Sequence, residues 1–265
     1  MHTSYFTLYL NLALLFLIEE VISRWKNWSV HKKILEIIMV TLFCTMIILL
    51  SARTAIAVSL LSVLFYCTIQ IIRLKRGTGI LILSLSIIVL MNFTATKFYN
   101  RYTQVEEEIK NHSEIVKSAS NSTNPRTYNS TQAHLEFWKN AIQVIKRNLI
   151  FGVGTGDIKE EMVKQYASVN FQYGVENRFS PHNQYLHTGV ILGLAGVILL
   201  LCCILLPLRA AVQQQDWMYA CFLLIIMFNA ITESILERQN GIIFYAFFNV
   251  LFYIQGISKS KNEFA

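Results

Sequence analysis

Charged residues and proline are scarce in this chain. Only 15% of its 265 residues are charged, three are proline, and 54% are hydrophobic. Soluble domains usually carry about 25% charged residues, so this composition excludes an ordinary water-soluble fold. Such an excess of apolar side chains indicates a protein that resides in a lipid bilayer.

Cysteines are also few and follow no recognisable pattern. Each one lies within an apolar stretch, where a thiol behaves as a small hydrophobic group. Their spacing fits neither a disulfide framework nor a zinc site, so we expect neither. The five are Cys44, Cys67, Cys202, Cys203 and Cys221.

Long apolar runs are what the chain has in abundance. A helix that crosses roughly 30 Å of hydrocarbon needs about 20 residues, and seven runs approach that length. We therefore expect an all-α, polytopic membrane protein with about seven transmembrane helices and one long, partly helical extracytoplasmic loop. The runs lie near 4–20, 34–51, 54–72, 79–96, 185–206, 217–234 and 242–257.

The first run has a second interpretation, as a signal peptide. It contains Asn11 and continues directly into Glu19 and Glu20, which makes it the least regular of the seven. However, it has neither a basic segment before it nor a small-residue cleavage site after it. These absences favour a membrane span.

Lysine and arginine indicate the orientation, because short cytoplasmic loops collect them. If the spans alternate in direction, ten basic residues fall on one side, while the opposite short loops hold only Arg53 and Arg238. This predicts an N-terminus outside the cytoplasm and explains the net charge of +7 without nucleic-acid binding. The ten are Arg24, Lys26, Lys32, Lys33, Arg73, Lys75, Arg76, Arg209, Lys259 and Lys261.

The spans divide the chain into four parts. We expect four transmembrane helices in 1–96, an extracytoplasmic loop in 97–184, three transmembrane helices in 185–257 and a cytoplasmic tail in 258–265. An outside N-terminus is unusual without an earlier insertion signal. Two interpretations stay open: the C-terminal part of a longer membrane protein, or a complete short one.

The long loop has a polar part and a helical part. Residues 103–133 are rich in Ser, Asn, Thr and Glu, which is typical of mobile, solvated chain. Beyond them, apolar residues at helical spacing predict an amphipathic helix that either lies on the membrane surface or packs on the rest of the loop. Asp157 can cap a second helix over 158–168. The apolar positions are Leu135, Trp138, Ile142 and Ile145.

Three glycines follow the first of these helices, in the stretch 151–157 (Phe-Gly-Val-Gly-Thr-Gly-Asp). One interpretation is a phosphate-binding loop, but the preceding strand and the Lys-Ser/Thr ending that make such loops specific are missing. The other is a helix C-cap followed by a turn.

His182 stands where the polar loop meets the fifth apolar run. Ser180 can act as an N-cap and Pro181 suits a first helical position, which would put His182 in the first turn of a helix. The positive end of a helix disfavours imidazolium, so His182 would be a neutral general base beside free N–H groups that can bind phosphate. The alternative is an interfacial histidine that caps the helix or bonds the loop.

Arginines are suited to bind a diphosphate, because the guanidinium group donates to two oxygens at once. Arg53, Arg126 and Arg178 are placed to do so, although each could instead be a solvated or snorkelling arginine. Glu233 and Arg238 close the outer end of the sixth run. Glu233 could pair with Arg53 or face water.

Several of these residues together resemble the signature region of the O-antigen ligase and polymerase superfamily of bacterial membrane glycosyltransferases. The resemblance covers roughly residues 50–255, and its most specific piece is the His-Asn-x-Tyr-Leu segment at 182–186. It also includes the following positions in the same order: Arg53, Arg126, Trp138, the Phe-Gly-Val-Gly turn at 151–154, Pro181, Gly189, Gly193 and Gly196.

The resemblance implies an inverting glycosyl transfer without metal or cofactor at the periplasmic face of the inner membrane. The donor would be an undecaprenyl-diphosphate-linked glycan, and the acceptor a hydroxyl of lipid A-core in lipopolysaccharide biosynthesis. His182 would activate the acceptor, while Arg53 and Arg126 would bind the diphosphate. Members of the superfamily typically have about twelve spans, and their last seven would start outside, as the charges here predict.

Two other functions stay open. A surface-polysaccharide polymerase would extend the lipid-linked glycan itself, and the sequence does not separate it from a ligase. A non-catalytic membrane subunit or a transporter belongs to another class. Transporters often carry polar or broken helices at mid-membrane, whereas mid-span polar residues are few here, mainly Gln70 and Asn229.

Overall fold

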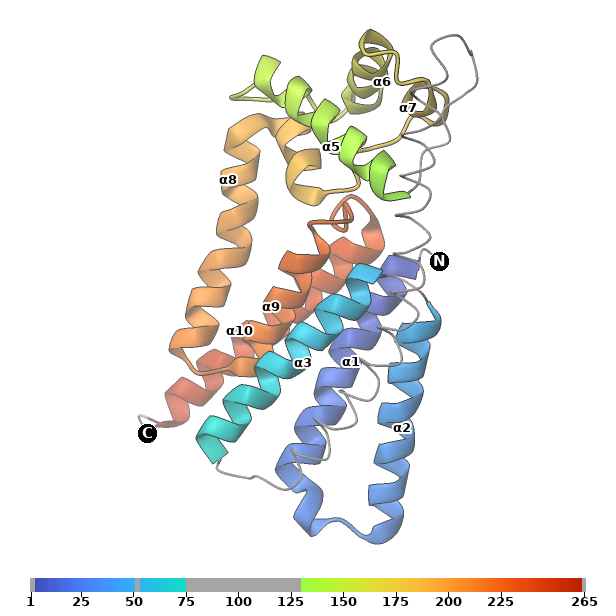
Figure 1. Ribbon diagram of the computed structural model, residues 1–265. Coiled ribbons are helices and arrows are strands. Elements are labelled where there is room, and N and C mark those ends of the chain that lie inside the picture. The colour runs from blue at the N-terminus through green and yellow to red at the C-terminus, as the bar shows by residue number, and fades with distance from the viewer. Residues whose placement is uncertain (1–2, 51–52, 75–129, 264–265) are drawn as a thin grey trace. The chain divides into compact units, whose positions relative to one another are not determined.

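The computed structural model describes residues 3–50, 53–74 and 130–263, and the regular structure in these ranges is helical throughout (Figure 1). The expected helical class is therefore confirmed for the described part of the chain. The apolar run at 79–96 and most of the polar segment 103–133 lie outside the described residues. The helices are α1 (Thr3–Arg24), the 3-10 helix η1 (Trp25–Asn27), α2 (Val30–Leu49), α3 (Arg53–Leu74), α5 (Ser130–Arg147), α6 (Ile158–Ser168), α7 (Gln172–Asn177), α8 (Gln184–Gln213), α9 (Trp217–Asn229) and α10 (Gln239–Glu263).

Three of the described helices are long and apolar enough to cross a membrane. They span Ser4–Asn27, Gln184–Gln213 and Gln239–Ser258, at the first, fifth and seventh expected runs. The second, third and sixth runs also form helices, while the total of seven spans stays a prediction. The helix of the sixth run is α9, which is shorter than expected. It ends at Asn229, and the following residues up to 234 form a turn.

Helix α9 forms the centre of the membrane-type helices. It packs against α1, α8 and α10, and its side chains are buried around its whole circumference. In a bilayer the hydrophobic effect does not drive helices together, because lipid tails are as apolar as the helix side chains. Close van der Waals packing therefore holds these helices together. The fully buried side chains of α9 are Ala220, Cys221, Phe222, Leu223, Ile225 and Ile226.

Helix α1 buries one face, formed by residues at spacings of three and four. This spacing places them in a single stripe, which faces the neighbouring helices α2 and α9. The cytoplasmic end that we predict for α1 carries an ion pair to α2, with Lys32 Nζ 3.0 Å from Glu20 Oε1. The buried stripe consists of Leu8, Leu12, Leu15 and Ile18.

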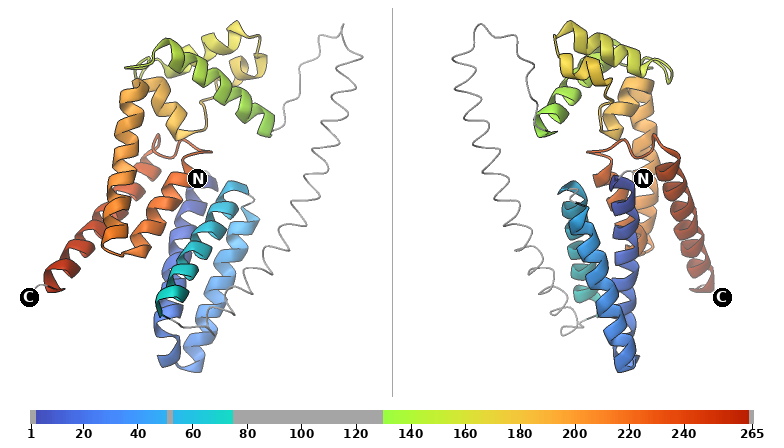
Figure 2. Two further views of the ribbon diagram at one scale, coloured as in Figure 1. Left: turned by 60° about the vertical axis from the view of Figure 1, so that its left-hand side comes forward. Right: turned by 90° about the vertical axis from the view of Figure 1, so that its right-hand side faces the viewer.

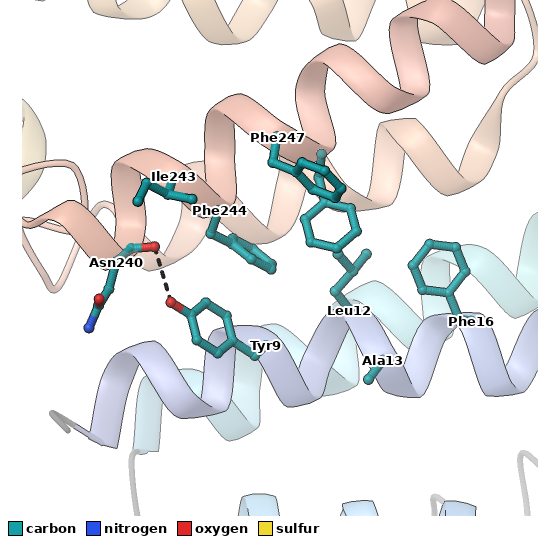
Figure 3. Close-up of a pocket in the computed structure, with 9 residues that line it drawn as sticks. Tyr9, Leu12, Ala13, Phe16, Asn240, Ile243, Phe244 and Phe247 are labelled. Carbon is teal, nitrogen blue, oxygen red and sulfur yellow. Dashed lines mark hydrogen bonds between the residues drawn. The ribbon is translucent and has the colours of Figure 1, made fainter.

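An apolar groove of about 440 Å³ lies between α1 and α10 (Figure 3). At one end the Tyr9 hydroxyl donates to the Asn240 carbonyl oxygen at 3.1 Å, and aromatic rings from both helices line the remainder. The groove is therefore polar at one end and apolar along its length. Its lining residues include Leu12, Ala13, Phe16, Ile243, Phe244 and Phe247.

Helices α5, α6 and α7 form a small core of their own, together with Phe171 and the start of α8. Phe137 is at its centre, and its ring lies 4.9 Å from the ring of Phe179 and 6.1 Å from that of Tyr166. Burying one such side chain stabilises the fold by roughly 1.5–3 kcal/mol. One face of the expected amphipathic helix thus packs on the rest of the loop.

The buried face of α5 differs from the one that the apolar pattern predicted. Trp138 and Ile145 are partly buried as expected, but Leu135 and Ile142 are 57% and 41% exposed. The core contacts come instead from Ala133, Phe137, Ala141 and Val144. The pattern was ambiguous because α5 has apolar residues on two opposite faces.

Helix α8 breaks sharply at Gly193, whose φ of 63° and ψ of −157° are not helical. The segments before and after the break lie side by side (Figures 1 and 2). A Cβ atom at Gly189 would lie 3.4 Å from Val197 Cγ2, whereas eight residues of straight helix span about 12 Å. The fifth apolar run is therefore two helical segments.

The glycine-rich turn after α5 docks onto this break. Backbone hydrogen bonds join the two: Val153 N to Val190 O at 2.8 Å, Gly154 N to Ile191 O at 2.9 Å, and Leu194 N to Leu149 O at 2.7 Å. The N–H groups of residues 152–154 are thus occupied by backbone carbonyls, which contradicts a phosphate-binding loop at these positions. The segment is a turn, as expected, but α5 ends at Arg147, five residues before Gly152, so the expected glycine C-cap is wrong.

Candidate functional site

His182 lies just before α8 and not inside its first turn. The helix begins at Gln184, and Asn183 is its N-cap, with its side chain accepting from Leu186 N at 3.0 Å. His182 itself has a positive φ of 48°. The expected capping by Ser180 is wrong, because the buried Asn183 places a side-chain oxygen closer to the open end of the helix.

The N–H groups at the start of α8 already have partners. Gln184 N donates to Ala230 O at 2.8 Å, Leu186 N to the Asn183 side chain, and His187 N to Asn183 O at 2.8 Å. Our expectation of free donors for a phosphate is wrong for these three groups. These three N–H groups are therefore not available to an anion.

A carboxylate stands beside His182. Glu233 Oε2 lies 3.5 Å from His182 Nδ1, and both side chains are about a quarter exposed, at 27% and 29%. The hydroxyl of Ser4 donates to the other carboxylate oxygen, Oε1, at 3.1 Å. Glu233 therefore links the start of α1, the turn between α9 and α10, and the residues before α8.

Gln184 holds that turn in place. Its side-chain oxygen accepts from Leu236 N at 2.7 Å, its backbone N–H donates to Ala230, and the Tyr185 hydroxyl donates to Met227 O at 2.9 Å. Gln184 is only 5% exposed. This role of Gln184 cannot be predicted from the sequence, because a glutamine beside an apolar run carries no distinguishing signal.

A second histidine, His134 on α5, lies against the first. The centroids of the two imidazole rings are 5.4 Å apart, and the rings of Phe137 and Phe179 each lie 6.0 Å from His182. Burial lowers the pKa of His134 below its ordinary value of 6.5, and His182 lowers it further, while Glu233 opposes the shift. His134 is therefore neutral at pH 7.

A second pair of histidine and carboxylate joins the first turn of α8 to the turn between α9 and α10. His187 is buried, and its Nδ1 lies 3.9 Å from Glu237 Oε2. Within the described residues this buried nitrogen has no hydrogen-bond partner. In the same described ranges we find no group of three or more His, Cys, Asp or Glu arranged to hold a metal ion.

The arginines are only partly accounted for. Arg178 is the C-cap of α7, with a left-handed φ of 50°, and is exposed. Arg238 is exposed at the start of α10, where its carbonyl accepts from Gly241 and Ile242. Arg53 begins α3, but its side chain lies outside the described residues, as does all of Arg126. The predicted pair of Arg53 and Glu233 thus stays a prediction.

Comparison with known proteins identifies the family to which this chain belongs. A protein of Haemophilus influenzae described only as uncharacterized is 33% identical over 126 residues, which cover 44% of this chain and 32% of that protein. The chain thus matches about a third of this relative's length. The family model for O-antigen ligase matches residues 37–201. This range includes the glycine turn, His182 and Asn183, and the chain belongs to the O-antigen ligase family.

Proposed function

We propose that this protein acts as a glycosyltransferase of the O-antigen ligase type. It transfers a glycan from an undecaprenyl diphosphate carrier to a hydroxyl of lipid A-core at the periplasmic face of the inner membrane. The observation that carries the proposal is the pair of His182 and Glu233, which lies beside apolar spans in a chain of this family.

His182 is the general base of the reaction. In this proposal Glu233, whose Oε2 lies 3.5 Å from His182 Nδ1, holds the proton of the imidazole on Nδ1, so that Nε2 presents a lone pair to the acceptor hydroxyl. As the proton of the acceptor hydroxyl moves to Nε2, the acceptor oxygen forms a bond to the anomeric carbon of the donor sugar. The bond from this carbon to the phosphate oxygen breaks on the opposite side, which inverts the anomeric centre.

The leaving diphosphate carries negative charge that must be stabilised. Arg53 and Arg126 bind it in this proposal, because guanidinium groups stay charged and donate to two oxygens. Arg178 and Arg238 are further exposed cations. No metal is required by this scheme. Asn183 supports the site by holding the start of α8, on which the position of His182 depends.

The groove between α1 and α10 suits the polyprenyl chain of such a donor. Ser4, which contacts Glu233, precedes Tyr9 on α1, and Asn240 follows the same turn that carries Glu233. The polar end of the groove therefore lies toward the site, and its apolar lining continues along the spanning helices (Figure 3).

Replacing His182 with alanine tests the role of the base. We expect loss of polymer attached to lipid A in cells that express the H182A full-length protein, with unchanged protein level in the membrane. An H31A variant is a suitable control, because His31 is exposed on α2. Undiminished attachment in H182A would rule out the role.

The carrier-bound glycan separates a ligase from a polymerase. If the protein is a ligase, its deletion leaves a ladder of chain lengths on undecaprenyl diphosphate. If only single repeat units remain on the carrier, the polymerase interpretation replaces ours. Movement of labelled substrate across liposomes without any new glycosidic bond would support the transporter class instead.

A further inference from the structure

Helix α5 carries a second apolar stripe, on the side opposite to its packed face. Leu135 and Ile142 are seven residues apart, so they share one side of the helix, and their side chains are 57% and 41% exposed. Leu149, in the turn just after the helix ends at Arg147, is 53% exposed. The packed residues, such as Phe137 and Ala141, lie about half a turn away from this stripe.

The stripe continues into an exposed tip. Ile150 and Phe151 follow it directly and are 63% and 79% exposed. Fraying does not explain this exposure, because the tip is bonded on both sides: Gly152 N donates to Asn148 O at 2.9 Å, and Ala195 N to Ile150 O. The glycine turn thus holds two large apolar side chains outward.

The tip is continuous with the apolar surface of α8. Leu194 donates its N–H to Leu149 O at 2.7 Å and is itself 51% exposed. Ile198 and Leu199, which are 54% and 64% exposed, continue the surface along the long segment of α8. That segment belongs to one of the helices that can cross a membrane, so its outward apolar residues are suited to face lipid.

Basic residues accompany the stripe. Lys139 and Lys146 are exposed on α5, and each precedes an apolar residue of the stripe by three positions, Ile142 and Leu149 respectively. Lysines so placed can extend along the apolar surface and reach anionic headgroups with their charged ends. Helix α5 also runs across the direction of the long segment of α8 (Figure 1), as a helix in the membrane plane does.

We propose that the outer face of α5 and its tip lie in the lipid interface of the bilayer. This interfacial surface consists of Leu135, Ile142, Leu149, Ile150 and Phe151, flanked by Lys139 and Lys146. It anchors α5, α6 and α7 at the edge of the hydrocarbon. His134 lies on the same helix and its ring contacts that of His182. The contact of α5 with lipid therefore also sets how far His134 lies from the hydrocarbon.

Spin labels on the full-length protein test this surface. With the five native cysteines replaced by serine, labels are attached in I142C and F151C, and in K159C as a water-facing control on α6. The protein is placed in nanodiscs of phosphatidylethanolamine and phosphatidylglycerol. We expect several-fold higher collision rates with oxygen relative to a water-soluble nickel chelate at 142 and 151 than at 159.

Two other results would overturn the proposal. Equal access of the nickel chelate to all three labels would place the stripe in water. Protection of 142 and 151 from both reagents would show that protein covers the stripe instead of lipid. If the cysteine-free protein does not fold, a photo-crosslinking amino acid at 142 and 151 in the native background gives the same decision, through crosslinks to lipid or to protein.

Discussion

Single residues from distant parts of the chain form the candidate site. His182 precedes α8, Glu233 lies in the turn after α9, Ser4 begins α1 and His134 lies on α5. Of these, His182 and Glu233 could be selected from the sequence, because a histidine and a carboxylate both stand at the ends of apolar runs. Ser4 and His134 could not, since nothing near them in sequence distinguishes them from other polar residues.

Glu233 should matter through its charge as well as its shape. In E233Q the side chain keeps its size but no longer accepts the Nδ1–H bond as a carboxylate, so it orients His182 less well. We expect the transfer rate to fall by about 10²-fold, near the lower end of what general base catalysis contributes. Rates in membranes with defined donor and acceptor measure this.

The matched control is S4A, which removes the other contact to the same carboxylate. It should reduce the rate much less, because the pair with His182 remains. Equal losses in S4A and E233Q would indicate that the carboxylate has only a structural role.

His134 predicts a dependence of stability on pH. Its pKa is lower in the folded protein than its ordinary value of 6.5, so the unfolded chain binds a proton more readily. The contribution of His134 to the free energy of unfolding is therefore fully present above pH 6.5, and it decreases as the pH falls below that value. Thermal unfolding of H134Q in detergent should show a weaker loss toward acid pH than the unsubstituted protein, and an identical loss would contradict the prediction.

At the scale of elements, the apolar runs predicted where helices form but not where they end or bend. Span six ended early at Asn229, and the fifth run contained a break at Gly193. A glycine in an apolar run is compatible with a continuous helix. Only its contact with the turn at Gly152, far away in sequence, makes a positive φ favourable here.

Gly193 should accept no side chain. Its φ is +63°, and a Cβ atom would collide with the carbonyl group of Ile150, so G193A should lower the free energy of unfolding by more than about 1 kcal/mol. In G156A nothing lies within 4 Å of the new Cβ, and the change should stay within about 0.5 kcal/mol. Chemical unfolding of both variants in detergent makes the comparison, and equal stabilities would refute the docked turn.

At the scale of the whole molecule, charge distribution predicts one orientation for every span. The C-terminal tail at 258–265 should lie in the cytoplasm, and helices α5, α6 and α7 should lie outside it. Alkaline phosphatase, which is active only outside the cytoplasm, should therefore be active when fused after Lys159 and inactive at the C-terminus. A fusion after Trp28, in the turn before α2, should also be inactive.

The opposite pattern of phosphatase activity would invert the assignment and move His182 to the cytoplasmic face. An active C-terminal fusion together with an active fusion after Lys159 would instead mean an even number of crossings between them. Either result would remove the periplasmic donor from the proposed reaction.

The sequence by itself determined the helical membrane class, the likeness to the O-antigen ligase superfamily and the histidine at the start of α8. These follow from composition and from residues close together in the chain. Tertiary structure alone decided the partner of His182, the fold-back at Gly193 and the packed face of α5. Each of these depends on which segment lies opposite, and apolar periodicity carries no information about that.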